Sequence, residues 1–323
     1  MELPSPPPGK LVVAHPERKA QRALRRLVGA TSCPVEIVTN GAALLAAVDS
    51  DTIAVVDSTI AQATPGLRDK PARAWIAVPG EGHVPADGAT VDALLAAGWS
   101  HVVAHAMPIL AEELLATVQK LLRNEVFGLE KYIAWGAEIR SYTLADARER
   151  DDAVTTLASD VVGVGLPDRI GSLVSVIADE LIANALYTAP VDEHKQRYRA
   201  NEPREHGRAL RGRDVVTVRW ATDARYLALE VRDRWGTLDP HAVAASLATG
   251  KASTSSTENG MGLALAYACC NQFVIDLEPD VMTEMIALLD VRYKPTELGR
   301  SASFHTFVAA PPAMAAAVAA GES

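Results

Sequence analysis

An acidic residue and an amide residue lie four positions apart in the segment 178–190, which reads Ala-Asp-Glu-Leu-Ile-Ala-Asn-Ala-Leu-Tyr-Thr-Ala-Pro. The segment is typical of an amphipathic helix that ends at the proline, so Glu180 and Asn184 are expected on one face, one turn apart. Carboxylate and amide oxygens in this arrangement can hold a divalent cation and its water. The alternative is a solvated helix acid and an asparagine near a helix end.

The helix that carries these two residues is expected to begin at Leu166-Pro167-Asp168, because proline is tolerated in the first helical turn. Apolar residues then recur with helical spacing and define a buried face. They are Ile170, Leu173, Val174, Ile177, Leu181 and Ile182. This buried face fixes the direction in which Glu180 and Asn184 point.

A second acidic residue suited to ligand binding follows two predicted strands, 215–221 and 226–231. Asp233 comes directly after the second strand and is followed by Arg-Trp-Gly236. An acid at a strand end, before a glycine turn, can accept a hydrogen bond from the edge of a ligand. The same pattern also occurs in ordinary turns.

A glycine-rich segment follows the polar stretch 249–258, which includes Lys251. The sequence Asn259-Gly260-Met261-Gly262 predicts a turn that opens an apolar helix. Glycine lets backbone amides approach a ligand closely, and the helix N-terminus adds a positive dipole, so an anion fits there. A hairpin, 273–277 with 283–291, and a last strand, 303–309, complete the predicted sheet.

This ordered series of motifs resembles the GHKL (Bergerat-fold) ATP-binding domain that type II topoisomerases, Hsp90, histidine kinases and anti-sigma serine kinases share. The sequence Asp-Glu-Leu-x-x-Asn-Ala at 179–185 is most similar to the histidine-kinase-like and anti-sigma branch. For residues 166–310 the resemblance implies an α/β two-layer sandwich that binds ATP and Mg²⁺.

The resemblance also implies a role for each motif residue. Glu180 would polarise the attacking water or hydroxyl, and Asn184 would ligate a Mg²⁺ ion that bridges the ATP phosphates. Asp233 would accept a hydrogen bond from the adenine amino group. The other implied nucleotide-binding residues are Gly236 in the adenine-side turn, Lys251 in the lid, Gly260, Met261 and Gly262 in the phosphate-facing turn, and Ser303 near the adenine side.

The segment 191–213 is expected to be a polar loop with many basic residues. They are Lys195, Arg197, Arg199, Arg204, Arg208, Arg211 and Arg213. The segment is either a surface insertion or a loop that binds phosphate or a partner.

Residues 10–123 alternate short apolar runs with helical patterns, which predicts a doubly wound parallel sheet with helices on both faces. The predicted strands are 10–14, 34–38, 52–56, 72–78 and 101–104, and the predicted helices are 17–28, 41–48, 66–70, 91–97 and 109–122.

Five βα units of this size resemble a response-regulator receiver domain, which has a flavodoxin-like fold. Asp57 falls where receivers carry their phosphoacceptor aspartate, but Ala14 and His15 replace the family's acidic pair and Met107 replaces its lysine. Aspartyl phosphorylation needs Mg²⁺, and one carboxylate without companions binds Mg²⁺ poorly. We therefore expect a pseudo-receiver that contacts another signalling protein, with Asp57 as a structural residue.

Residues 124–165 are expected to form a helical connector, with helical patterns at 125–135 and 144–159. The second pattern is either a solvated face or, through its apolar residues, a contact in a homodimer. These apolar residues are Leu144, Ala147, Val154 and Leu157. No histidine occurs between His105 and His194, so a phosphoacceptor histidine for autophosphorylation in cis is not expected here.

Composition limits the remaining function classes. The 323-residue chain has a formal net charge of −9, which argues against nucleic acid as the main partner because phosphate binding needs a basic face. Its three cysteines, Cys33, Cys269 and Cys270, lack metal-ligand spacing and fit a reducing cytosol. We find no signal-peptide pattern in residues 1–9 and no continuous apolar stretch of the roughly 20 residues that span a membrane.

The expected protein is therefore soluble and cytoplasmic, with a disordered N-terminus at 1–9 and a flexible tail at 311–323. The first functional hypothesis is an ATP-binding bacterial signalling regulator, in which a receiver-like module is coupled to a nucleotide-gated, histidine-kinase-like ATPase domain. The alternative is an active ATP-dependent protein kinase, acting on serine or on histidine in trans, or a slow ATPase. The altered receiver site favours the first hypothesis, and the Glu180–Asn184 pair favours the second.

Overall fold

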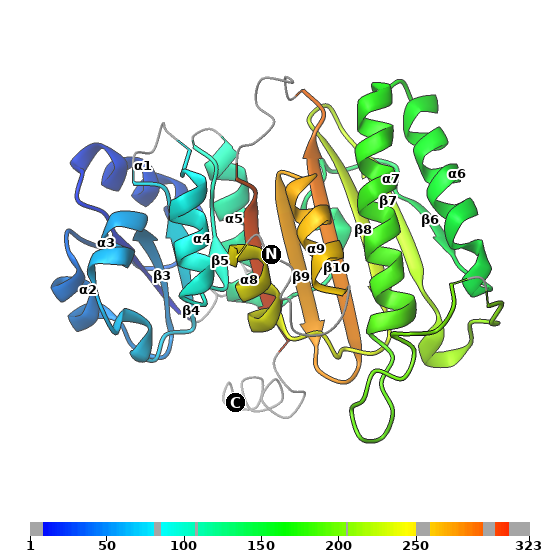
Figure 1. Cartoon of the computed structure of the whole chain (residues 1–323). Helices are drawn as coiled ribbons and strands as arrows, with labels where there is room; N and C mark the ends of the chain where they lie inside the picture. The colour runs from blue at the N-terminus through cyan, green and yellow to red at the C-terminus, as the bar shows by residue number, and fades with distance from the viewer. Residues whose placement is uncertain are drawn as a thin grey trace, which may run out of the picture. The chain divides into compact units, whose positions relative to one another are not determined.

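The computed structural model describes residues 9–80, 85–106, 109–204, 206–249, 259–292 and 301–309 (Figure 1). The protein is mixed α/β, as the sequence predicts. It divides into two compact units. Unit 1 comprises Met1–Glu125 and Arg300–His305, and unit 2 comprises Val126–Gly299 and Thr306–Ser323. The segment predicted as a connector, 124–165, falls almost entirely within unit 2.

Unit 1 contains a parallel sheet with the strand order β2-β1-β3-β4-β5. All five strands follow the apolar runs of the sequence. They are β1 (Lys10–Ala14), β2 (Val35–Val38), β3 (Thr52–Asp57), β4 (Ala74–Val78) and β5 (His101–Val102). All six residues of β3 are buried, as expected for a parallel strand that is covered on both faces.

Helices cover both faces of this sheet (Figure 1). They are α1 (Arg18–Gly29), α2 (Gly41–Ala47), α3 (Ser58–Ala63), α4 (Gly88–Ala96) and α5 (Ile109–Arg123). Helix α1 packs against α5, whereas α2, α3 and α4 pack against one another in sequence. The predicted helix at 66–70 is only a 3₁₀ turn, η1 (Leu67–Asp69). The sequence analysis missed α3, which begins directly after Asp57.

The last strand, β11 (Ser303–Val308), begins in unit 1, where it runs antiparallel to β5. A buried carboxylate holds this end of the strand, because Glu113 of α5 accepts hydrogen bonds from His105 Nδ1 at 2.9 Å and His305 Nε2 at 2.7 Å. Burial alone would raise the pKa of Glu113, but the two histidines outweigh burial and lower it to about 2.

Unit 2 contains an antiparallel sheet with the strand order β9-β10-β8-β7-β6. The strands are β6 (Arg140–Thr143), β7 (Thr217–Thr222), β8 (Tyr226–Asp233), β9 (Gln272–Glu278) and β10 (Met282–Asp290). The sequence analysis missed β6. This strand has four residues, none of them buried, so it carries no apolar run.

Figure 1 shows three helices of unit 2 on one face of this sheet, α6 (Arg150–Gly163), α7 (Asp168–Ala183) and α9 (Asn259–Ala268). Helix α7 packs against both α6 and α9. A fourth helix, α8 (Pro240–Thr249), packs against α9 and was not predicted.

The predicted helix at 125–135 does not form, because Gly128 adopts φ 122°, outside the helical region, and only the 3₁₀ turn η2 (Leu129–Lys131) follows. Buried carboxylates on the sheet bind this segment. Glu284 accepts the Gly128 N–H at 2.8 Å, and Glu230 accepts the Leu129 N–H at 3.2 Å. Arg232 forms ion pairs with both carboxylates.

Helix α7 continues directly into a π-helical segment, η4 (Asn184–Thr188). The Ala189 N–H donates to the Asn184 carbonyl oxygen at 2.8 Å, which is the wider hydrogen bond of a π-turn. By length and composition the combined helix Asp168–Thr188 could cross a membrane, contrary to the expectation from continuous apolar runs. However, 67% of its apolar window is buried inside the protein, which is typical of the core helix of a soluble protein.

Candidate functional site

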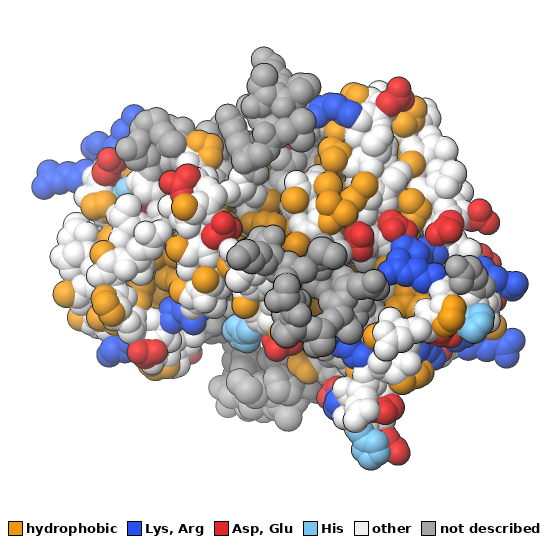
Figure 2. Space-filling view, viewed as in Figure 1, with side chains coloured by type: hydrophobic (Ala, Val, Ile, Leu, Met, Phe, Trp, Pro, Cys, Tyr) orange, Lys and Arg blue, Asp and Glu red, His pale blue; other side chains and the backbone are white. Residues whose placement is uncertain are grey.

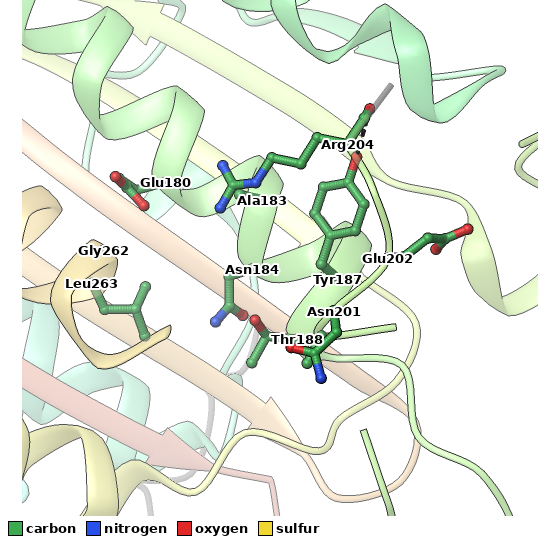
Figure 3. A pocket seen from close by; sticks show the side chains of 11 residues that line it. Glu180, Ala183, Asn184, Tyr187, Thr188, Asn201, Glu202, Arg204, Gly262 and Leu263 are labelled. Atoms are coloured by element: carbon green, nitrogen blue, oxygen red, sulfur yellow. Dashed lines mark hydrogen bonds between the residues drawn. The ribbon is translucent and has the colours of Figure 1, made fainter. Parts of the chain in front are cut away.

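A polar cavity of about 270 Å³ lies in unit 2, between the end of α7, the start of α9 and the loop that follows α7 (Figure 3). Its polar and charged lining includes Glu180, Asn184, Tyr187, Thr188, Asn201, Glu202 and Arg204. The start of α9 contributes Gly262 and Leu263. Three residues that the sequence analysis selected, Glu180, Asn184 and Gly262, therefore lie in one cavity.

Glu180 and Asn184 occupy successive turns at the point where α7 changes into the π-helical segment. Asn184 is buried and is the first residue of that segment. A π-turn is uncommon and occurs frequently at functional sites, because the extra residue redirects side chains that an α-helix would place elsewhere. The amide of Asn184 and the carboxylate of Glu180 both reach the cavity (Figure 3).

The carboxyl group of Glu180 has a raised pKa. Partial burial is the main cause, and the neighbouring Asp179 adds to it, while Arg150 and Arg204 act in the opposite direction. Arg150 Nη2 forms an ion pair with Asp179 Oδ1 at 2.5 Å, so Asp179 already balances the charge of Arg150. A carboxylate with a raised pKa is a stronger base once it is ionised, which suits proton abstraction.

Gly262 allows α9 to approach Glu180. A Cβ atom at this position would lie only 2.2 Å from Glu180 Oε2 and 3.0 Å from its Cδ. The structure corrects the predicted turn, because Gly260, Met261 and Gly262 all lie in the first turn of α9 and not before it. The backbone amides of a first helical turn lack partners within the helix, so they remain available to an anion.

The loop 191–213 forms one wall of the cavity through Asn201, Glu202 and Arg204. Ion pairs fix the loop. Arg199 forms a two-bonded pair with Asp214, at 2.7 and 2.9 Å. Arg208 pairs with Glu202 and also donates to the Leu186 carbonyl oxygen of the π-segment at 3.3 Å. The sequence analysis noted the basic residues of this loop but selected none of them as a site residue.

Asp233 ends β8 and is 1% exposed. Its Oδ1 accepts the N–H groups of Trp235 at 2.7 Å and Gly236 at 3.4 Å, while Oδ2 has no hydrogen-bond partner among the described residues. Burial raises the pKa of Asp233 to about 6. Asp233 does not line the cavity, but its turn is joined to the π-segment because Thr237 Oγ1 donates to the Ala189 carbonyl oxygen at 2.5 Å.

Gly236 has a structural reason to be glycine. Its φ is +62°, and a Cβ atom would lie 2.2 Å from the Glu278 carbonyl oxygen, so the turn after β8 packs directly on the turn between β9 and β10. Neighbouring Trp235 lies under the guanidinium of Arg213, with 4.6 Å between Cζ and the ring centroid. Neither Gly236 nor Trp235 lines the cavity.

Ser303, another predicted residue, does not line the cavity. The Ser303 hydroxyl lies in unit 1, where it accepts the Ala104 N–H at 2.8 Å and lies 3.1 Å from His105 Nδ1. The predicted lid, 251–259, lies outside the described residues except for Asn259, so Lys251 is not described, and neither are residues 1–8 and 310–323.

Asp57 in unit 1 is fully buried, and hydrogen bonds within the protein engage one of its two carboxylate oxygens, whereas the other has no hydrogen-bond partner among the described residues. Oδ1 accepts the N–H groups of Thr59 and Ile60, at 2.9 and 3.1 Å, and the Thr59 hydroxyl, so Asp57 caps the start of α3. Oδ2 lies 3.5 Å from Nε2 of the equally buried His15. This arrangement agrees with the expectation that Asp57 is a structural residue.

The described residues contain no group of three or more His, Cys, Asp or Glu side chains that could hold a metal ion by themselves. Glu180 and Asn184 offer two hard oxygen ligands at most. This set fits Mg²⁺, which commonly binds through one or two protein oxygens, several waters and the phosphates of a substrate.

No protein-family model matches the sequence, and no curated protein matches it. The site is therefore interpreted from its own residues.

Proposed function

We propose that the protein is an ATP-binding signalling regulator, in which unit 2 binds ATP and Mg²⁺ in a GHKL-like pocket and unit 1 is a pseudo-receiver that contacts another signalling protein. One observation carries the proposal. Glu180 and Asn184 of α7 and Gly262 of α9, three motif residues from separate parts of the sequence, meet in one polar cavity.

The size and lining of the cavity support the phosphate part of this proposal. Complete small-molecule sites usually enclose about 300–1,000 Å³, so a cavity of about 270 Å³ suits one part of a nucleotide. The amides at the start of α9 and the guanidinium of Arg204 suit phosphate oxygens. Oδ2 of buried Asp233, which has no hydrogen-bond partner among the described residues, suits the adenine amino group, as the resemblance implies.

Mg²⁺ bound beside Asn184 would neutralise negative charge on the phosphates. The protein's own contribution is to hold and orient. Asn184 is fixed by burial and by the π-turn, and Gly262 leaves room for the Glu180 carboxylate beside it.

The arrangement of strands supports both resemblances. The antiparallel sheet of unit 2, with α6, α7 and α9 on one face, agrees with a two-layer α/β sandwich. The parallel order β2-β1-β3-β4-β5 in unit 1 is the flavodoxin-like order of receivers. In unit 1, His15 and the cap of α3 engage Asp57, which favours partner binding over phosphorylation. A reducing cytoplasm suits the three free cysteines.

A second function, turnover of ATP by hydrolysis or by phosphoryl transfer to a protein, is favoured by Glu180 alone. Its raised pKa makes it a competent general base for water or a hydroxyl group. The regulator needs Asn184 and the cavity, whereas the enzyme also needs Glu180 to act as a base.

Calorimetric titration of the full chain with ATP, with and without Mg²⁺, tests the binding proposal. We expect Asn184→Ala to weaken binding about 10- to 100-fold with Mg²⁺, because a metal ligand is lost, and to leave the weaker metal-free binding unchanged. Wild-type protein that fails to bind ATP with Mg²⁺, or an Asn184→Ala variant that binds as tightly as wild type, would contradict the proposal.

Phosphate release from labelled ATP separates the two functions. We expect Glu180→Gln to retain ATP binding and, if Glu180 acts as a base, to lower turnover about 10²- to 10⁴-fold. Glu138→Gln, at an exposed acid of unit 2, is the matched control and should behave as wild type. If phosphate release does not depend on Glu180 and no phosphate is transferred to proteins, the enzyme is excluded and the regulator remains.

A further inference from the structure

The basic residues of the loop 191–213 differ in how they are engaged. Arg199 is paired with Asp214, Arg208 is paired with Glu202, and Arg213 donates to the carbonyl oxygens of Arg234, Trp235 and Asp280. Arg204 lines the cavity, and its guanidinium has no carboxylate within ion-pair distance and no hydrogen-bond acceptor among the described residues. Its positive charge acts to lower the pKa of Glu180, although no ion pair joins these two described side chains.

The position of Arg204 is nevertheless fixed. Its backbone carbonyl oxygen accepts the Tyr187 hydroxyl at 3.4 Å, and its Cζ lies 5.9 Å from the centroid of the Tyr187 ring. Tyr187 belongs to the π-segment that begins at Asn184. The loop on either side is held by the Arg199 and Arg208 ion pairs, so Arg204 is supported from both directions.

Figure 3 shows the guanidinium of Arg204 directed toward Glu180, with Asn184 beside both. The charges of the lining indicate what fits between them. Glu202 is neutralised by Arg208, which leaves Glu180 and Arg204 as the charged groups that face the open space. Figure 2 shows basic side chains gathered around the end of α7 and the loop after it, with acidic side chains nearby. A phosphoryl group with a divalent cation complements this pair of charges.

We propose that Arg204 is a specificity-determining residue that binds the terminal phosphate of ATP, so that the pocket distinguishes ATP from ADP. This inference rests on the proposed function, which places Glu180 beside the phosphate that is attacked. Because Arg204 faces Glu180, it reaches the same phosphate. Asp233, on the proposed adenine side, does not line this cavity. ADP lacks the terminal phosphate and so leaves Arg204 without a ligand.

Titration of the full chain with ATP and with ADP, both with Mg²⁺, tests the inference. Arg204→Gln removes a charge-assisted hydrogen bond to the terminal phosphate, so we expect it to weaken ATP binding about 10- to 100-fold. The affinity for ADP should change less than about threefold. Arg204→Lys keeps the charge but loses the two-bonded geometry, so it should fall between wild type and Arg204→Gln. Arg197→Gln, at an exposed arginine of the same loop outside the cavity, is the matched control.

The outcomes separate this inference from the proposed function. If Arg204→Gln lowers the affinities for ATP and ADP equally, or lowers neither affinity, the inference about Arg204 is wrong but the proposal that the protein binds ATP is retained. If wild-type protein binds neither nucleotide, both the inference about Arg204 and the proposed function are wrong. An effect of Arg197→Gln equal to that of Arg204→Gln would also overturn the inference, because general loop charge would then explain it. Thermal unfolding of each variant shows whether the fold is retained.

Discussion

Asp57 and Glu180 are both carboxylates at places where the sequence suggests phosphoryl chemistry, yet their surroundings differ. Asp57 is fully buried, caps α3 with one oxygen and faces His15 with the other. Glu180 is partly buried and lines a cavity together with Gly262 of α9, where an added Cβ would meet the Glu180 carboxylate. Asp57 has one carboxylate oxygen bonded within the protein and the other beside a buried histidine, whereas Glu180 faces a cavity.

The comparison shows that the residues beside a carboxylate decide whether it can bind anything. At Asp57 the buried side chain of His15 lies 3.5 Å from Oδ2, in addition to Gly80, whose added Cβ would lie 3.2 Å from the same atom. At Glu180 the neighbour is a glycine, whose missing Cβ keeps the space beside the carboxylate open. Both carboxylates lie beside a helix start, so the contrast comes from the neighbouring side chains.

The largest expected effect comes from removing the fully buried carboxylate of Asp57. Asp57→Ala removes the cap of α3 and leaves His15 buried beside no anion, so we expect the free energy of unfolding to fall by about 2–4 kcal/mol. Chemical denaturation of purified protein measures it. Asp87→Ala, which removes the exposed cap of α4, is the control and should cost only about 1 kcal/mol. A stable aspartyl phosphate on Asp57 after treatment with acetyl phosphate would contradict the comparison.

A smaller effect is expected at Asp233, which like Asp57 has one hydrogen-bonded carboxylate oxygen and one without a hydrogen-bond partner among the described residues. Its pKa in the folded protein, about 6, lies above the ordinary value of 3.8, so Asp233 favours folding below pH about 4. That contribution is lost as the pH rises through 6. We expect Asp233→Asn to raise the free energy of unfolding by about 1–3 kcal/mol at pH 8, while weakening ATP binding.

Asp223 provides the opposite control for this prediction. Burial would raise its pKa, but N–H groups of Tyr226, Ala134 and Arg225 outweigh burial and lower it. Asp223→Asn should therefore lower stability at pH 8. The free energy of unfolding of both variants is measured across a pH series. Equal effects of Asp233→Asn and Asp223→Asn would contradict the inferred difference between a carboxyl group with a raised pKa and one with a lowered pKa.

The smallest effect on stability is expected at Gly262. The atom that a new Cβ would meet is the end of the flexible Glu180 side chain, which can move away. We therefore expect Gly262→Ala to change the free energy of unfolding by less than about 1 kcal/mol, but to displace the Glu180 carboxylate and reduce Glu180-dependent phosphate release. Gly163→Ala in α6, where a Cβ meets nothing within 4 Å, is the matched control. Unchanged phosphate release in Gly262→Ala would contradict the inference that the glycine beside Glu180 keeps space open for a ligand.

Local pattern was sufficient for part of the fold. Continuous apolar runs located the five strands of unit 1, and helical spacing located α7 with Glu180 and Asn184 on it. Two elements carried no such signal. Strand β6 has no buried residue and forms by pairing with β7, and α8 follows a proline within a segment read as a loop. The predicted helix at 125–135 failed because Gly128 is bound by Glu284 of a distant strand.

The candidate site shows the same limit. The motif sequence was enough to expect that Glu180, Asn184 and Gly262 meet, and they do. Arg204 could not be selected, because the sequence gives several similar basic residues in one loop and only the tertiary structure shows that Arg204 lines the cavity. The Ser303 hydroxyl is engaged in unit 1 through Ala104 and His105, contacts between residues far apart in the chain.

The assignment of Arg300–His305 to unit 1 has a consequence for biosynthesis. The ribosome makes all of α1 to α5 first, but the Glu113 carboxylate receives its hydrogen bond from His305 only after β6 to β10 have been synthesised. Domains near the start of a chain usually fold as units while synthesis continues. Here the unit whose synthesis begins first is the last to receive its final strand.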